Sequence, residues 1–158
     1  MQHVPAIDLA RWFEQRINDS VPFALGASRL YGITIVDPAG LAQHEPGAAL
    51  ASYVAEDHDP HRLLRRPSSD LALCHDAVAL LATGWVTSLD RQLVELSLRP
   101  GRRKVRLVVV AGDAGLAAVA RRFDRPDHAV PVPGRCLGSL CDAVRALWDA
   151  GVQLRPAS

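Results

Sequence analysis

The chain has few of the residue types, and little of the net charge, that mark several common protein classes. It holds one lysine, three cysteines and few aromatic residues, and its formal net charge is +1 over 158 residues. A charge this close to zero supplies no general attraction to nucleic acid or to an anionic membrane surface. No apolar stretch approaches the roughly 18 residues that a membrane-spanning helix requires. We therefore expect a protein outside the membrane, folded as a single domain over residues 1–158.

The cysteines exclude two further kinds of structure. Cys74, Cys136 and Cys141 are odd in number and form no CxxC pair, whereas disulfide frameworks and zinc fingers need paired cysteines. The N-terminal residues lack the basic-then-apolar pattern of a secretory signal, so reduced thiols in the cytoplasm are the plain interpretation. Cys74 stands beside His75 and Asp76, but triad residues meet in space rather than in sequence. We predict that Cys74 is a small core residue.

The most apolar run of the chain lies in residues 104–123, KVRLVVVAGDAGLAAVARRF. Its β-branched residues are too few for a membrane helix and predict a buried strand over residues 105–111. Alternate side chains of a strand point to opposite faces. One face would carry Val105, Leu107 and Val109, and the other Arg106, Val108 and Val110.

A glycine-containing turn, GDAG at residues 112–115, ends this run, and its glycines permit positive φ angles. The following residues 116–123 fit two structures. With a period of two they form the return strand of a hairpin, which the short turn favours. With a period of 3.6 they form a helix capped by Asp113, which their alanines favour. The sequence leaves both alternatives open, and they lead to different functions.

Amphipathic helices are predicted near both ends of the chain. The first covers residues 5–18, with an apolar stripe that leaves Glu14 among the polar residues outside it. The second is capped by Ser139 and stopped by Gly151. These two helices provide apolar faces that must pack against a sheet.

The predicted fold class is α+β, with a mostly antiparallel sheet of four or five strands packed in two layers against the N- and C-terminal helices. Residues 43–70 read as a polar connection in which only 48–54 form a strand or a helical turn, and residues 71–81 are helical in an alternative interpretation. Val130 and Val132 offer an edge strand in a proline-rich segment. The four principal strands are expected at residues 30–36, 78–89, 105–111 and 116–123.

Motifs of common catalytic and cofactor sites are absent from the chain. It contains no GxSxG, HExxH or EF-hand loop, and GDAG matches neither GxGxxG nor a GK[ST] ending. His58 and His61 lie beside Glu56 and Asp57, but Pro60 interrupts any regular helix between the two imidazoles. We therefore interpret this histidine-containing segment as a solvated polar loop. We therefore predict no cofactor and no metal site.

One basic cluster offers a candidate site for anions. Its charges suit contacts with phosphate groups, although no aromatic residues for base stacking are interleaved with it. Basic residues at the mouth of a strand also serve as a solvated face or prevent edge pairing. Nucleic-acid contact is thus a third hypothesis. The candidate anion-binding residues are Arg102, Arg103, Lys104 and Arg106.

Three stretches resemble a set of small uncharacterised proteins of GC-rich Gram-positive bacteria. They are TGWVTSLD (residues 83–90), RPGRRKVRLVVV (residues 99–110) and a closing GSL-D-A-RALW helix (residues 138–148). This resemblance covers a little under half of the chain. It implies a hairpin-based α+β domain with no assigned activity.

The segment VRLVVVAGDAGLAAVARRF is also similar to the strand–Asp–helix segment of PIN and NYN nucleases, in which a hydrophobic strand leads through Ser-Gly-Asp into a helix. Asp113 is the matching acid, Asp37 after the strand ITIV matches the first acid, and Asp70 matches a middle one. The resemblance implies a parallel sheet whose clustered carboxylates hold Mg²⁺ or Mn²⁺ and activate water.

Together these patterns favour a non-enzymatic interaction or regulatory module. It would assemble with a protein partner or as a homo-oligomer, through a sheet edge or an apolar helix face. The alternative is a metal-dependent ribonuclease of the PIN/NYN type that uses Asp37, Asp70 and Asp113. The conformation of residues 116–123, strand or helix, separates the two hypotheses.

Overall fold

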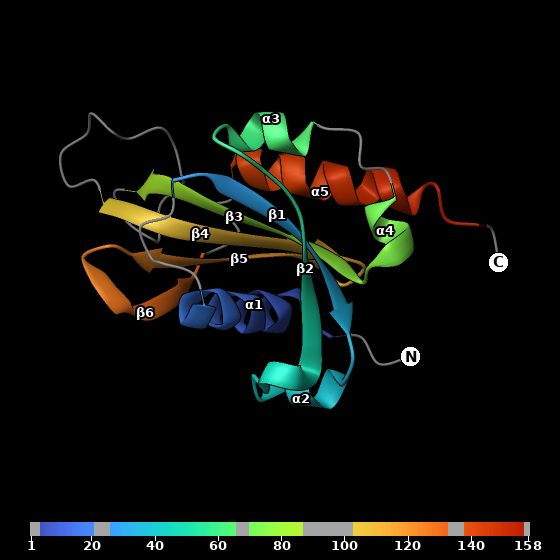
Figure 1. Cartoon of the computed structure of the whole chain (residues 1–158), viewed down its shortest axis with the longest axis horizontal. Helices are drawn as coiled ribbons and strands as arrows, with labels where there is room; N and C mark the ends of the chain where they lie inside the picture. The colour runs from blue at the N-terminus through green and yellow to red at the C-terminus, as the bar shows by residue number, and fades with distance from the viewer. Residues whose placement is uncertain (1–3, 21–25, 66–69, 87–102, 133–137, 157–158) are drawn as a thin grey trace.

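A computed structural model describes residues 4–20, 26–65, 70–86, 103–132 and 138–156. These residues form one six-stranded antiparallel sheet in the order β2-β1-β3-β4-β5-β6 (Figure 1). The prediction of an α+β fold with an antiparallel sheet is confirmed, with six strands where four or five were expected. The strands are β1 (Ser28–Ile35), β2 (Ala49–Asp57), β3 (Ala77–Val86), β4 (Arg103–Gly112), β5 (Gly115–Arg122) and β6 (Arg125–Pro131).

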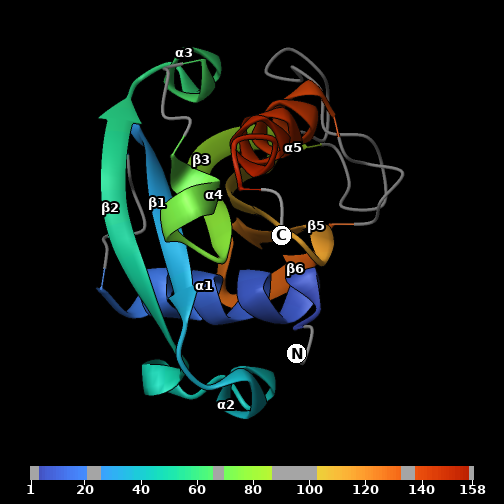
Figure 2. The same ribbon diagram turned by 90° about the vertical axis from the view of Figure 1, so that its right-hand side faces the viewer.

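Helices cover both faces of the sheet, so the described elements form three layers rather than the two expected. One face carries the N-terminal helix, and the other carries the C-terminal helix with two short helices beside it (Figures 1 and 2). None of the helices in the described ranges is long and apolar enough to cross a membrane. The helices are α1 (Ala6–Ser20), α2 (Pro38–Ala42), α3 (Pro60–Leu64), α4 (Leu71–Cys74) and α5 (Ser139–Val152), with the 3₁₀ turn η1 (Pro46–Ala48).

The predicted alternation in β4 is confirmed and explains the two cores. Val105, Leu107 and Val109 belong to the apolar cluster under α5, whereas Val108 and Val110 belong to the cluster under α1. Because helices cover both faces, both sets of side chains leave water. Burial of each large aliphatic side chain contributes about 1.5–3 kcal/mol. The apolar run of β4 therefore contributes side chains to both hydrophobic cores.

The ambiguous segment after the GDAG turn is a strand. Gly112 pairs with Gly115, so only Asp113 and Ala114 lie between the paired positions of β4 and β5. Gly115 has a φ angle of +118°, which L side chains rarely adopt. The hairpin prediction is confirmed and the helical alternative is wrong, because the pairing with β4 outweighs the modest helix propensity of the alanines.

Strand β2 was only partly anticipated, since most of residues 43–70 read as a polar connection. It pairs with β1 alone, and its outer edge meets no other described element. Its residues alternate poorly in polarity because a long part of it is exposed on both faces. Likewise, the alternative helix over residues 71–81 is confined to Leu71–Cys74, and β3 begins at Ala77. Residues 87–89 of the predicted strand 78–89 lie outside the described residues.

The cysteines do not follow the prediction that Cys74 lies in the core. Cys74 ends the short helix α4 and is exposed, whereas Cys141 of α5 is buried. Burial raises the pKa of the Cys141 thiol to about 11, which keeps it protonated and unreactive at neutral pH. Cys136 lies outside the described residues. A four-residue helix on the surface of the sheet leaves its last side chain in solvent.

Gly32 of β1 is a point of close approach between the sheet and the residues that follow α4. The imidazole of His75 lies over its backbone, and a Cβ atom at Gly32 would stand 2.3 Å from His75 Cδ2 and 2.5 Å from Cγ. The same imidazole lies 3.3 Å from the hydroxyl of Thr34 through Nδ1. Only glycine leaves room for this ring.

We expect Gly32→Ala to lower the free energy of unfolding by about 1–3 kcal/mol, because the new methyl group displaces the half-buried His75 ring. Chemical denaturation measures the loss. Gly47→Ala is the matched control, since a Cβ there meets nothing within 4 Å. The double variant Gly32→Ala/His75→Ala should recover part of the loss. Equal effects of the two single glycine variants would show that the His75 contact is not the cause.

Candidate functional site

The three predicted nuclease acids occupy turns and helix starts. Asp37 precedes α2 and Asp70 precedes α4, and neither side chain makes a capping hydrogen bond. Asp113 lies in the β4–β5 turn, where its carboxylate accepts hydrogen bonds from Arg155 Nη1 at 2.8 Å and Trp148 Nε1 at 3.3 Å. Among the described residues no group of three acidic, histidine or cysteine side chains is placed to hold a metal ion.

The arrangement that the nuclease resemblance implies is not formed at Asp113. The residues after this aspartate continue into β5 rather than into a helix, and the strands on both sides of the turn are antiparallel. Carboxylates gather above a parallel sheet because successive strands end at the same edge, and the described strands do not run that way. Asp113 instead ties the hairpin turn to the C-terminal segment through Arg155.

The histidines near β2 are exposed, as expected for a polar loop. His58 follows β2, and His61 lies in α3, where its backbone N–H donates to Asp59 Oδ1 at 2.9 Å. The neighbouring Asp57 accepts two hydrogen bonds from Arg62, at 2.8 and 2.9 Å. These polar groups cap the short helix α3 and close the turn after β2.

The basic cluster is divided by the alternation and burial of β4. Lys104 is exposed, with its Nζ 4.9 Å from the centre of the Phe123 ring. Arg106 points inward and its side chain is 0% exposed. Arg103 begins β4, and Arg102 lies outside the described residues. The prediction that Arg106 belongs to a surface anion site is wrong, because its guanidinium group is used inside the protein.

Arg106 takes part in a buried ion network between α1 and the sheet. Glu14 Oε2 accepts hydrogen bonds from Arg106 Nη2 and Arg121 Nε, both at 2.8 Å, and Glu14 Oε1 accepts one from Arg121 Nη2 at 2.7 Å. Arg106 Nη2 also donates to Asn18 Oδ1 at 3.0 Å. The prediction that left Glu14 on the polar side of its helix is wrong, since this residue is 2% exposed.

The two arginines of the network are direct cross-strand partners. Arg106 of β4 is opposite Arg121 of β5 in the hairpin register. Like charges in this position repel one another, and burial removes the water that would screen them. Glu14 lies between them from α1 and accepts from both guanidinium groups. The carboxylate therefore makes the packing of α1 on this hairpin electrostatically favourable.

The surroundings of Glu14 decide its charge state. Burial alone would raise the pKa of its carboxyl group, but hydrogen bonds and charge interactions with Arg121 and Arg106 outweigh burial and leave the pKa below its ordinary value of 4.5. Glu14 is thus ionised at neutral pH. The hydrogen bonds that Arg121 donates to Glu14 likewise raise the pKa of Arg121 against the effect of burial.

We expect Glu14→Ala to lower the free energy of unfolding by about 3–5 kcal/mol, because it leaves two buried guanidinium groups opposite each other without their shared carboxylate. Denaturant titration at pH 7 measures this loss. Gln15→Ala, on the same helix turn, is the control and should change the stability by about 0.5 kcal/mol or less. A loss in Glu14→Ala no larger than in the control would show that the network is energetically unimportant.

The pKa shift of Glu14 predicts an acid dependence of stability. A carboxyl group with a lower pKa in the folded state than in the unfolded state stabilises the fold above the unfolded value, and this contribution disappears as pH falls through the folded value. Wild-type protein should therefore lose stability as pH falls below about 4.5. Titrating the free energy of unfolding against pH in wild type and Glu14→Gln tests this. Identical slopes below that pH would contradict it.

The two edges of the sheet differ in chemistry. The edge strand β6 has the sequence RPDHAVP, with two prolines that lack an N–H donor and with charged side chains that oppose pairing. The edge strand β2 has the sequence ALASYVAED, and its first seven residues carry neither charge nor proline. Figure 2 shows β2 at the margin of the molecule, with no described element beyond it. Of the two edges, β2 is therefore the one available for pairing.

Exposed apolar side chains accompany this open edge. Leu50 and Tyr53 of β2 are 60% and 55% exposed, and Val36, which follows β1, is 61% exposed. Tyr53 packs edge-on against Tyr31 with ring centres 6.1 Å apart, and its hydroxyl donates to Glu56 Oε1 at 3.0 Å. A register shift opposite Leu30 and Tyr31 bounds the regular part of the ladder at Ala49–Tyr53.

Comparison with protein-family models, curated proteins and solved structures finds no match for this chain. The resemblances to small α+β proteins of Gram-positive bacteria and to PIN/NYN nucleases thus stay predictions. The Glu14 network was missed from the sequence, and the strand β2 was anticipated only in part, as one of two alternatives for residues 48–54. The signal for β2 was its lack of charge and proline, and the signal for Glu14 was an arginine within the apolar run of β4.

Proposed function

We propose that the protein is a non-enzymatic interaction module that forms a homodimer by pairing β2 with β2 of a second copy. The observation that carries this proposal is the contrast between the two sheet edges: β6 has prolines and charges, and β2 has seven neutral residues with exposed Leu50 and Tyr53. An unpaired strand presents a row of N–H and C=O groups that another strand can complete.

A second copy suits this edge because β2 is compatible with itself in the antiparallel direction. The strand is neutral over residues 49–55 and acidic at Glu56 and Asp57. Antiparallel pairing places the acidic ends of the two strands at opposite ends of the shared ladder, while the neutral parts face each other. Parallel pairing would bring four carboxylates together. The charge pattern therefore favours a two-fold symmetric arrangement.

The chemistry of β6 explains why such assembly would stop at two copies. If both edges were open, copies would add at either side and extend the sheet without limit. Pro126 and Pro131 remove two N–H donors from β6, and Arg125, Asp127 and His128 add charge or polarity to that edge. With one available edge in each copy, pairing produces a closed dimer.

A modest affinity is expected for this interface. Main-chain hydrogen bonds over the short regular ladder and the burial of a few apolar side chains resemble small transient interfaces, which bury less than about 1,200 Å². A dissociation constant of about 10 µM is typical of such contacts. Assembly would then respond to the protein concentration, as suits a regulatory module.

Light scattering coupled to size-exclusion chromatography tests the proposal. Wild-type protein should move toward twice its mass of 17.1 kDa as its concentration rises. The variant Leu50→Lys/Ser52→Lys should remain a monomer, because both positions are exposed on one face of β2 and four lysines would meet across the two-fold axis.

The matched control carries the same two added charges elsewhere. Leu73→Lys/Leu154→Lys changes exposed leucines of α4 and of the segment after α5, so it should dimerise like the wild type. Thermal unfolding of all three proteins as monomers checks that the substitutions leave the fold intact. A wild type that is monomeric throughout the concentration series, or a β2 variant that still dimerises, would reject the proposed interface.

A further inference from the structure

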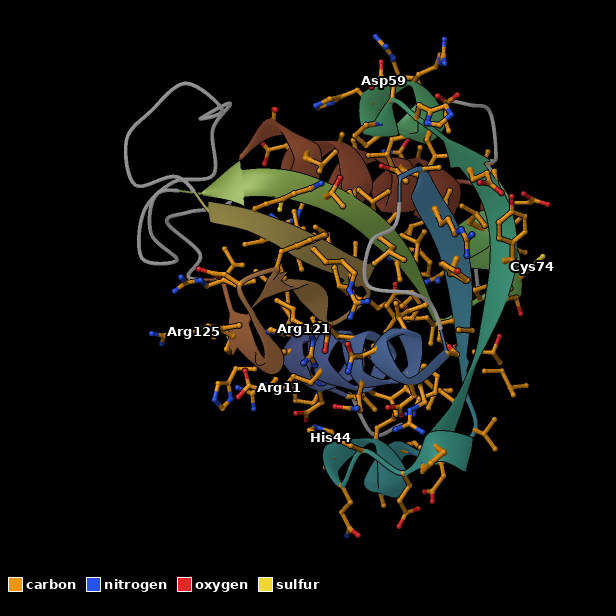
Figure 3. All side chains as sticks on the ribbon, turned by 60° about the vertical axis from the view of Figure 1, so that its left-hand side comes forward. Arg11, His44, Asp59, Cys74, Arg121 and Arg125 are labelled. Carbon is orange, nitrogen blue, oxygen red and sulfur yellow. The ribbon has the colours of Figure 1, made fainter. Side chains whose placement is uncertain are left out.

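A pocket of about 300 Å³ lies between α1, β5, β6 and the turn after α2. Its volume is at the lower end of the range of small-molecule sites. Figure 3 shows Arg11, Arg121 and His44 along the same side of the molecule, contributed by three separate elements. The charged and polar side chains that line the pocket are Arg11, Glu14, Gln15, His44, Arg121, Asp127 and His128.

The floor of the pocket belongs to the buried ion network. Arg121 is 4% exposed and is held in place by both oxygens of Glu14 and by the carbonyl of Pro126, to which its Nη1 donates. The carboxylate of Glu14 is buried, and Arg106 and Arg121 both donate to it. A fixed guanidinium group at the base of a pocket is a prearranged partner for an anion.

Two further nitrogen-bearing side chains stand at the mouth of the pocket. Arg11 is exposed on α1, and His44 is half-buried in the turn after α2. Neither side chain makes a hydrogen bond or ion pair with another residue in the described ranges. Asp127 and His128, in contrast, lie on β6 with their side chains 3.3 Å apart. Arg11 and His44 are therefore the donors that an incoming ligand would meet.

His44 is held in an unfavourable backbone conformation. Its φ angle is +56°, and it is the only described residue other than glycine with a positive φ. The backbone N–H of His44 bonds to Leu41 O at 3.0 Å, and that of Glu45 to Gly40 O at 3.0 Å, which is the Schellman pattern that ends α2. Glycine is the usual residue at this position because it avoids the Cβ penalty.

The turn would form with glycine at position 44, so the backbone strain that the His44 side chain introduces is not required by the turn itself. Residues kept in rare backbone conformations cluster at ligand-binding sites, and His44 lines the pocket beside Arg11. The turn itself is fixed from α1, since Trp12 Nε1 donates to Glu45 O at 2.9 Å. The strained residue His44 and the two arginines Arg11 and Arg121 thus line the same pocket.

We propose that this pocket binds a compact oxyanion, a small molecule carrying a phosphate or carboxylate group, between Arg11, His44 and Arg121. Asp127 lies at the rim, and its exposed carboxylate would oppose larger or more highly charged anions. A ligand with one oxyanion group and a small body fits the volume and this charge arrangement. No residue of β2 lines the pocket, and the site does not depend on the proposed dimer.

Thermal unfolding and isothermal titration calorimetry test the site with two probes, inorganic phosphate and propionate, at constant ionic strength against sodium chloride. At least one probe should raise the melting temperature of the wild type above the chloride control, because a ligand that binds only the folded state stabilises it. A response to phosphate alone identifies a phosphoryl ligand, and a response to propionate alone identifies a carboxylate. No response to either probe overturns the proposal.

Two variants separate binding from folding. Arg11→Ala should weaken affinity by about tenfold, the usual effect of losing one charge-assisted hydrogen bond. His44→Gly should weaken affinity similarly while raising the melting temperature of the ligand-free protein, because glycine relieves the strained φ angle. A purely structural role for His44 predicts no loss of affinity.

The matched control is Arg125→Ala, which removes an exposed arginine of β6 that does not line the pocket (Figure 3). It should leave the affinity for either probe unchanged. If Arg125→Ala weakens binding as much as Arg11→Ala does, the anion is attracted by general surface charge and the pocket is not a site. Unchanged affinity in both Arg11→Ala and His44→Gly would also overturn the assignment.

Discussion

The carboxylate of Glu14 accepts hydrogen bonds from two arginines that the hairpin register places directly opposite each other. Arg106 and Arg121 are cross-strand partners on the face of the sheet that α1 covers, and both are buried. Without the carboxylate, like charges would be buried together, and packing the helix over them would cost stability. The position of α1 on the sheet thus depends on an electrostatic requirement as well as on apolar contact.

This requirement also gives the α1 interface a specific geometry. Apolar contacts between a helix and a sheet are non-directional and tolerate small shifts along the helix axis. The three hydrogen bonds from Arg106 and Arg121 to Glu14 and the bond from Arg106 to Asn18 place successive turns of α1 at defined points over β4 and β5. A network of this kind stabilises one arrangement by making the shifted ones costly.

The sequence predicted best those elements whose partners lie nearby in the chain. The alternation of β4 was readable because both its faces are buried, and the β4–β5 hairpin was one of two alternatives because its turn is short. Glu14 was misplaced because its partner Arg106 lies 92 residues away, and helical periodicity alone cannot reveal such a contact. Strand β2 was uncertain because an edge strand exposed on both faces lacks the polar alternation that identifies strands.

The candidate sites show the same contrast: some depend on residues close together in the sequence, and others on contacts between distant segments. The aspartates Asp37, Asp70 and Asp113 drew attention through local sequence, yet they lie in turns and before short helices, where aspartate is common for backbone reasons. The β2 edge and the Arg11–His44 pocket arise only when separate segments meet. Neither has a motif, because strand pairing uses main-chain groups and the pocket gathers its side chains from α1, β5, β6 and the turn after α2.

One short segment connects these two regions physically. The chain leaves α2 through His44 and Glu45, forms the turn η1, and enters β2 at Ala49. Trp12 of α1 anchors this segment through its hydrogen bond to Glu45 O, and α1 is itself fixed by Glu14. The backbone strain at His44 therefore lies five residues before the start of the open edge. Pairing with β1 holds β2 along its length, and the contact with α1 holds the turn that leads into it, so the ion network under α1 supports both the pocket and this turn.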